Sequence, residues 1–311
     1  MRRLFKNLAI GVVVALILFG AVGCAKESPE QALKKMIQAM ARAEACYAEI
    51  KVWVNGQFPQ LTSLNLDEAK FYPGTIIIDL KGDMGFRKNL EFALNGLAKY
   101  RLLDSEIEFN GDTIYQDGAL YLKLSKVPSL KLVDLSSVKN NWYKFDFAAV
   151  GLASGLSESA EKLNDKKNQR LRKLVEDTEF FDIVSDEGID VVNYEESRKF
   201  TVKIKQERMF GFMKKLTEIM DEREISAEEE AALKNNLAKL NDVEFRVWVA
   251  RKSYRLARLE FGLPLETKEH GALRYDVVLN FSGYNQVINI EKPKDVRDFN
   301  MLEIFSGAGA E

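Results

Sequence analysis

Alternating apolar and polar positions dominate the chain from residue 45 onwards, and this period of two predicts β-strands that bury one face. In the first such segment one face is apolar and the other polar or aromatic: Cys46, Ala48, Ile50, Val52 and Val54 against Tyr47, Glu49, Lys51 and Trp53. Comparable segments occur at 76–81, 90–94, 107–109, 120–124, 143–147, 180–192, 200–204, 243–249, 259–263, 275–281 and 287–290. The pattern is typical of an antiparallel sheet with one face on a core. A short helix or tail is expected at 296–305.

Turn residues separate these segments and indicate hairpins. The strongest signal is Asp117-Gly118, because Asp-Gly between alternating segments favours a two-residue hairpin turn. The segments 82–83 (Gly-Asp) and 110–112 (Asn-Gly-Asp) have similar composition. We expect turns at all three places.

Three segments have a helical period instead. The first follows Ser28 and Pro29, a typical cap and first position, and its apolar stripe is Leu33, Met36, Ile37 and Met40. Residues 157–177 have a thin apolar stripe and predict either a surface helix or a partly disordered crossover. A helical hairpin is expected at 206–240, where a Ser-Ala-Glu-Glu capping box at 226–229 starts the second helix.

The N-terminus has the composition of a secretory signal that ends in a lipid-attachment cysteine. Its apolar run, residues 8–19, is shorter than the ~20 residues that a spanning helix needs. The preceding basic residues are Arg2, Arg3 and Lys6. Residues 21–24 (Ala-Val-Gly-Cys) resemble the bacterial lipobox, which implies acylation of Cys24. An ordinary signal or an uncleaved anchor is the alternative.

The expected organisation follows from these segments: a signal peptide at 1–23, a tether at 24–28, one domain at 29–305 and a tail at 306–311. The expected location is extracytoplasmic, with Cys24 anchored in the lipid of the cell membrane, or of the outer membrane if the host has two. If Cys24 is acylated, no intramolecular disulfide can form, because Cys46 is the other cysteine of the chain.

Composition and motifs argue against two function classes. The 45 basic and 47 acidic residues give a formal net charge of −2, so no basic surplus favours a nucleic-acid partner. The single histidine, His270, lies in a charged, turn-like segment. Motifs for a nucleophile elbow, a phosphate loop, a dinucleotide site or a zinc helix are missing from the sequence. We therefore expect neither an enzyme nor a bound cofactor or metal.

Several segments together resemble the LolA/LppX-type bacterial lipoproteins: the lipobox and residues 119–123, 141–146, 247–256 and 281–293. The resemblance implies an α+β fold, a curved antiparallel β half-barrel with helices on its concave side. In characterised members that space holds acyl chains or lipoproteins, and no catalytic residue accompanies it. The hairpin at 206–240 is expected as an insertion.

The predicted function is that of a membrane-anchored protein that binds a lipid or other apolar ligand between sheet and helices. Methionine and phenylalanine on the helical hairpin suit such a lid, since they can repack around varied ligands. The side chains expected at the ligand are Val52, Phe92, Val202, Val247 and Val277 on the sheet and Met209, Phe210 and Met213 on the hairpin. Two alternatives remain: these residues fill a core, or the protein is an anchored scaffold that meets another envelope protein through sheet edges or the Trp53/Trp248 face.

Overall fold

The structure, a computed structural model, describes residues 27–59, 71–86, 90–103, 105–128, 135–145, 165–267 and 271–298. The predicted signal peptide, Cys24, His270 and the predicted tail lie outside these ranges.

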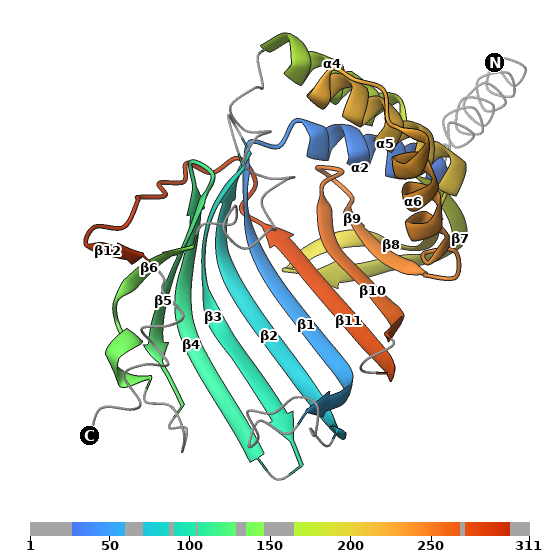
Figure 1. The fold of residues 1–311 in the computed structure, drawn as a ribbon. Coiled ribbons are helices and arrows are strands. Elements are labelled where there is room, and N and C mark those ends of the chain that lie inside the picture. Colours follow the sequence, from blue (N-terminus) through green and yellow to red (C-terminus); the bar gives the residue numbers. More distant parts are fainter. Residues whose placement is uncertain are drawn as a thin grey trace, which may run out of the picture.

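The described strands form one sheet of twelve, in the order β12-β6-β5-β4-β3-β2-β1-β11-β10-β9-β8-β7 (Figure 1). The strands are β1 (Ala45–Pro59), β2 (Phe71–Gly85), β3 (Glu91–Leu102), β4 (Ser105–Gln116), β5 (Ala119–Lys126), β6 (Trp142–Phe145), β7 (Phe181–Val192), β8 (Glu195–Ile204), β9 (Phe245–Ala250), β10 (Leu256–Thr267), β11 (Gly271–Ser282) and β12 (Val296–Asp298). The α-helices are α2 (Pro29–Ala41), α4 (Asp165–Asp177), α5 (Gln206–Asp221) and α6 (Ala227–Ala238). Neighbouring strands are antiparallel except β12 and β6, which are parallel.

The register separates the sheet into an apolar and a polar face. Val52 of β1 lies opposite Val277 of β11 and Ile78 of β2, so these three side chains share one face. The next residue along β1, Lys51, is on the other face and pairs with Asp79 at 3.2 Å. Further ion pairs lie on that polar face: Arg274–Asp276 within β11, and Lys123–Asp112, Arg246–Glu260 and Lys199–Glu187 between neighbouring strands. Each such ion pair adds only ~0–1 kcal/mol to stability, but together the pairs indicate that this face is exposed to solvent.

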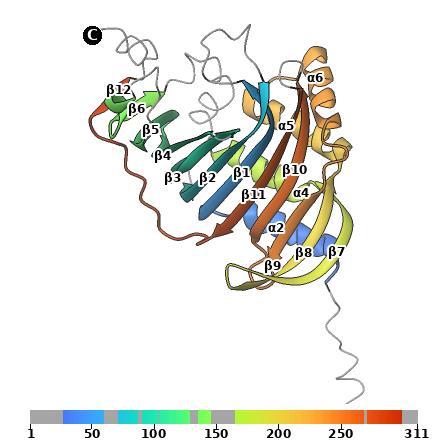
Figure 2. The same cartoon turned by 90° about the horizontal axis from the view of Figure 1, so that it is seen from below.

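The sheet is curved, and its polar face is the convex one. Figure 2 shows the chain after β11 running along the outside of the curve towards β12. This segment contacts polar-face residues: the Gln116 amide donates to the Ile290 carbonyl oxygen at 3.1 Å, and the Lys292 ammonium lies over the Tyr121 ring at 5.9 Å. The apolar face is therefore concave. The predicted α+β fold, a curved antiparallel sheet with helices on the concave side, is confirmed.

Helix α2 packs on the concave face at the β7–β10 end, as its apolar stripe predicts. Its capping box is present, since the backbone N–H of Gln31 donates to Ser28 Oγ at 3.2 Å. Ala32, Leu33 and Met36 are buried in one cluster with strand residues Phe200, Val202, Val247 and Val249. Most of the stability of such a short helix comes from this burial.

The helical hairpin at 206–240 is confirmed as α5 and α6. Ser226 caps α6, because its hydroxyl accepts from the Glu229 backbone N–H at 3.2 Å and the Glu229 carboxylate accepts from the Ser226 N–H at 2.8 Å. Of the helix predicted at 157–177, α4 (Asp165–Asp177) is described, and it packs against α2 and α5.

Two predicted turns, one predicted strand and one terminal expectation are wrong. Residues 287–290, expected as a strand, lie in the irregular segment between β11 and β12. Only Asp117-Gly118 forms the expected turn, with φ of 51° and 74°. Gly82-Asp83 lies inside β2 and residues 110–112 lie inside β4, where a bulge shifts the register beside Asn110. Glycine suits these positions because neighbouring backbone approaches closely: a Cβ at Gly82 would lie 2.0 Å from the Ala93 carbonyl oxygen. Val296–Asp298, expected in a helix or tail, pair with β6 and cover its edge.

Candidate functional site

The concave face carries a continuous row of apolar side chains across the sheet. Starting from Val52, the row passes through Val277 of β11 to Phe261 of β10, because each residue lies opposite the next. It then reaches Phe245 of β9 and Val202 of β8. Three of the predicted ligand residues, Val52, Val202 and Val277, thus stand on one row, and Val247 stands on the neighbouring row opposite Leu259. Their contact with a ligand stays a prediction.

Helix α2 covers the β8–β9 end of this row and of the neighbouring row. Val202 and Val247 have exposed fractions of 0% and 1%, because α2 lies over them. At this end the concave face is a filled hydrophobic core. A ligand could reach these two valines only if α2 moved.

The other part of the concave face is half-buried, and we call it the open zone. It extends over β1, β2, β3, β4, β10 and β11, away from the contacts of α2 with β7 and β9. Its members are Ile50, Val52, Ile76, Ile78, Leu80, Ala98, Tyr100, Phe109, Phe261, Leu263, Tyr275, Val277 and Leu279, each neither fully buried nor fully exposed. None carries a charged group, so the zone is suited to hydrocarbon.

Aromatic contacts fix the margins of the open zone. Phe58 and Tyr100 meet edge to face with ring centroids 5.8 Å apart, and Phe245 and Phe261 lie 5.2 Å apart where the zone meets the filled core. Burial raises the pKa of the Tyr100 phenol, so this group remains a hydrogen-bond donor at neutral pH.

Phe92, also predicted at the ligand, lies at another closed corner of the face. Its ring stacks on that of buried Tyr115, with ring centroids 5.4 Å apart. Cys46 of β1 lies on the same row, two strands away, and is 1% exposed. Desolvation by burial, followed by the charge of Asp83, raises the pKa of the Cys46 thiol to about 11. The thiol is therefore a packed, protonated group at neutral pH.

The predicted lid residues Met209, Phe210 and Met213 lie on α5, whose main neighbours are α4 and α6 (Figure 1). They are half-buried. Phe210 lies under the Lys234 ammonium of α6 at 4.9 Å. Phe212 meets Phe180 edge to face at 4.9 Å. The structure therefore groups these residues with the neighbouring helices. Their role at a ligand stays a prediction.

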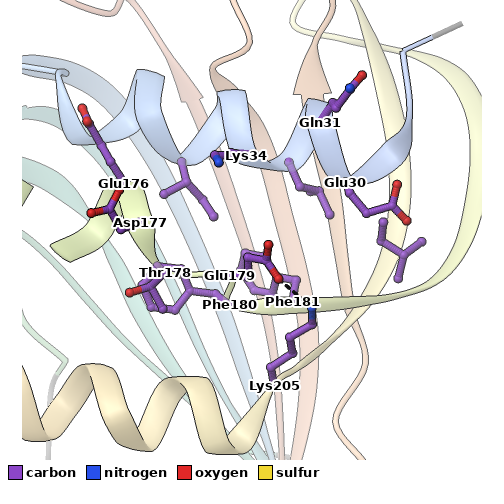
Figure 3. A pocket seen from close by; sticks show the side chains of 13 residues that line it. Glu30, Gln31, Lys34, Glu176, Asp177, Thr178, Glu179, Phe180, Phe181 and Lys205 are labelled. Carbon is purple, nitrogen blue, oxygen red and sulfur yellow. Dashed lines mark hydrogen bonds and ion pairs between the residues drawn. The ribbon is translucent and has the colours of Figure 1, made fainter. Parts of the chain in front are cut away.

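A small pocket of about 290 Å³ lies between α2 and the start of β7 (Figure 3). Leu33, Ile37 and Phe181 form its apolar wall. Charged groups line its rim, among them Lys205, whose ammonium pairs with Glu179 at 3.3 Å. Because ligand pockets for drug-sized molecules usually measure ~300–1,000 Å³, this one is small for a lipid, and its charged rim disfavours an acyl chain.

The apolar face that sequence patterns predicted is the concave face, but of the open zone the predicted ligand residues include only Val52 and Val277. Ile78, Tyr100, Phe261 and Tyr275 were not expected at the ligand. Alternation alone places them on an apolar face, and the pairing register between β1 and its two neighbours then brings them together with Val52. Knowledge of which strands pair would have identified them.

In the ranges that the structure describes, no helix is both long and apolar enough to cross a membrane. Within those same ranges, no group of three or more His, Cys, Asp or Glu side chains is arranged to hold a metal ion.

Comparison with known proteins finds similarity in structure alone. No family model and no curated protein sequence matches the chain. The solved structures similar to it include lipoprotein LppX from Mycobacterium tuberculosis, with 13% identity and a TM-score of 0.39 over 84% of this chain and 97% of that one. LprF from Mycobacterium bovis has 14% identity and a TM-score of 0.39 over 86% of this chain and 98% of that one. Lipoproteins of the type that the sequence resembles are thus among its structural neighbours.

Proposed function

We propose that this protein is a membrane-anchored lipoprotein that binds a lipid, or another ligand with long apolar chains, on the open zone of its concave face and performs no reaction on it. The observation that carries the proposal is the contrast between the two ends of one apolar row. Val202 is fully covered by α2, whereas Val52 and Val277 are only half-buried.

The energetics favour an apolar occupant. Burying apolar surface contributes ~25 cal/mol per Å², and a contiguous exposed apolar patch on a protein surface commonly marks a binding site. The convex face shows that this chain places ion pairs where a strand faces water, as with Lys51 and Asp79. The opposite composition of the open zone therefore favours a ligand over solvent as its neighbour.

The ligand's polar part would meet few partners. The polar side-chain atoms of the open zone are the hydroxyl groups of Tyr100 and Tyr275. They stand on one row, separated by β1 and β2, since Tyr275 faces Val54, Val54 faces Ile76 and Ile76 faces Tyr100. Three strand spacings of ~4.8 Å place their Cα atoms ~14 Å apart. Hydroxyl groups suit the ester or hydroxyl groups of a ligand and offer no counter-charge.

Anchoring would come from acylation of Cys24, which precedes α2 by a few residues. Two or more acyl chains on one residue hold a protein at a membrane stably, because each buried methylene contributes ~0.8 kcal/mol. The ligand would then pass to or from the adjacent membrane.

The test is to purify a secreted Cys24→Ser form without detergent, extract it with organic solvent and identify co-purified lipids by mass spectrometry. A Cys24→Ser form that also carries Val277→Asp is the matched sample, and it should lose the lipid. A protein that is empty and admits no apolar fluorophore would contradict the proposal.

The anchored scaffold is the second candidate, and the filled core under α2 favours it. One of its two predicted contact residues is unsuited, because Trp248 is 4% exposed, its indole N–H donates to Asp190 at 2.9 Å, and Lys199 lies over its ring. Crosslinking in cells separates the candidates: one recurrent protein partner without bound lipid would favour the scaffold.

A further inference from the structure

The described chain begins at a point that is fixed to the sheet. The Glu27 carbonyl oxygen accepts a hydrogen bond from Arg198 Nη1 of β8 at 2.6 Å, and the Glu27 carboxylate pairs with the Lys35 ammonium at 2.7 Å. Arg198 is itself held by an ion pair with Asp186 of β7. Cys24 is three residues earlier, and three extended residues span at most ~11 Å. An acyl anchor on Cys24 would therefore enter the membrane beside β7 and β8.

The hairpin that joins β7 to β8 has an unusual tip. Val192 pairs with Glu195, so Asn193 and Tyr194 form a two-residue turn, and both have positive φ, 49° and 63°. Such turns prefer glycine at the second position. A bulky L-residue in that conformation is strained, at a cost in stability. The Tyr194 side chain is fully exposed, at 104% of the reference area, so burial of its ring within the chain does not offset this cost.

Exposed apolar side chains accompany Tyr194 towards the anchor point. Val191 is 65% exposed and lies opposite Glu196; Ile189 is 53% exposed and lies opposite Arg198, the residue that holds Glu27. Figure 2 shows this hairpin and the start of α2 on the same side of the molecule. The apolar side chains thus extend from the anchor point to the tip of the hairpin.

We propose that Ile189, Val191 and Tyr194 form a membrane-contacting tip that enters the interface of the bilayer in which Cys24 is anchored. This inference rests on the anchoring part of the proposed function, and it is independent of ligand binding on the open zone. Tyrosine suits a bilayer interface because its ring is apolar and its hydroxyl reaches water or headgroups.

The charges around the tip are compatible with a lipid surface. Glu196 is paired with Arg251 of the neighbouring β9–β10 turn at 2.7 Å, and Lys252 of that turn is exposed. The acidic group at the tip itself is Glu195. Since acids and bases are balanced here, apolar and aromatic contact carries the docking, and a neutral phosphatidylcholine bilayer is a sufficient partner.

The test places a tryptophan at the tip of the full chain, purified from membranes and reconstituted in phosphatidylcholine vesicles with brominated acyl chains. The wild type has a background fluorescence from Trp53, Trp142 and Trp248. The additional fluorescence of Tyr194→Trp should be quenched by the brominated chains more strongly than this background. The matched control is Leu103→Trp, because Leu103 is 63% exposed and also has positive φ, but lies in the β3–β4 turn. The additional fluorescence of Leu103→Trp should not be quenched by the brominated chains.

Mass spectrometry of the same samples establishes whether Cys24 is acylated. Quenching at position 194 in an acylated chain supports the tip. Quenching in a chain without acyl groups also supports it, while removing the proposed anchor. An acylated chain with equal emission from the two variants overturns the tip and keeps the anchor, and an unmodified chain without quenching overturns both.

Discussion

Gly96 of β3 lies directly opposite Gly111 of β4 on the concave face. Backbone from the neighbouring strands approaches both: a Cβ at Gly96 would lie 1.9 Å from the Asp79 carbonyl oxygen, and one at Gly111 would lie 2.4 Å from the Lys123 carbonyl oxygen. Glycines at such places permit a sheet to bend. The shape of the open zone therefore depends on two residues that contribute no side chain to it.

We expect Gly96→Ala to destabilise the protein by about 1–3 kcal/mol, because the added methyl group must push backbone aside. Urea unfolding followed by circular dichroism measures this change. Gly211→Ala is the matched control: its Cβ meets nothing within 4 Å, and alanine in a helix is more stable than glycine by ~0.5–1 kcal/mol. Equal destabilisation of the two variants would show that Gly96 is not sterically required.

Val277 and Val278 are adjacent on β11 and face opposite sides of the sheet, so they form a matched pair for ligand binding. Val277→Thr keeps the shape and the strand preference but adds a hydroxyl to the open zone. We expect it to weaken binding of an acyl-chain fluorophore about fivefold, equivalent to ~1 kcal/mol. Val278→Thr, beside Lys51 on the convex face, should leave the affinity unchanged. A titration in which both variants bind equally would exclude the open zone as the site.

The contribution of Cys46 to the stability of the fold should depend on pH. Its pKa in the folded protein is about 11, above the ordinary value of 9.0 because of burial. The thiolate is thus favoured in the unfolded chain, so the contribution of Cys46 to stability is present below pH 9 and is lost as the pH rises through about 11. We expect stability to fall between pH 9 and pH 11 less steeply in Cys46→Ala than in the wild type.

The same burial should suppress the reaction of Cys46 with a thiol reagent. At pH 8.5 the native protein should react far more slowly than the unfolded protein, because the thiolate is the reactive form. Rapid reaction of the native thiol would show that this corner of the concave face is open.

The faces of the strands were predictable because alternation depends only on neighbouring residues. Val52, Val202, Val247 and Val277 are all on the predicted apolar face. Their different burial was not predictable, because it depends on where α2 lies. Helix position and strand order bring together residues that are far apart in sequence, such as Leu33 and Val247, which lie in one buried cluster. A local sequence pattern contains no information about such contacts.

The wrong turns have a related cause. Asn110-Gly111-Asp112 and Asp117-Gly118 have similar local chemistry, yet the first lies in a strand and the second turns the chain. The difference is set by the neighbouring strands: Gly111 is needed where backbone from β5 approaches. Glycine therefore marks either a turn or a close approach, and only the pairing of strands distinguishes the two.

The contacts at the start of α6 predict that the stability of the protein depends on pH in the acidic range. Glu229 accepts from the Arg223 guanidinium at 2.6 Å and from the Ser226 backbone N–H at 2.8 Å. These contacts, the Arg223 hydrogen bond first, lower the pKa of its carboxyl to about 2, from an ordinary 4.5. Because the folded pKa is depressed, the stabilisation is present above pH 4.5 and is lost as the pH falls towards 2.

We therefore expect thermal unfolding of the wild type to shift to lower temperature between pH 4.5 and pH 2 more than that of Glu229→Gln, which cannot lose this charge. Ser226→Ala, which removes the other half of the capping box, should cost about 1 kcal/mol at neutral pH. Glu228→Gln is the control, since Glu228 lies in the same first turn but outside the capping box. If Glu228→Gln flattens the acid dependence as much as Glu229→Gln does, the effect belongs to the general charge of the helix terminus and not to the contacts of Glu229.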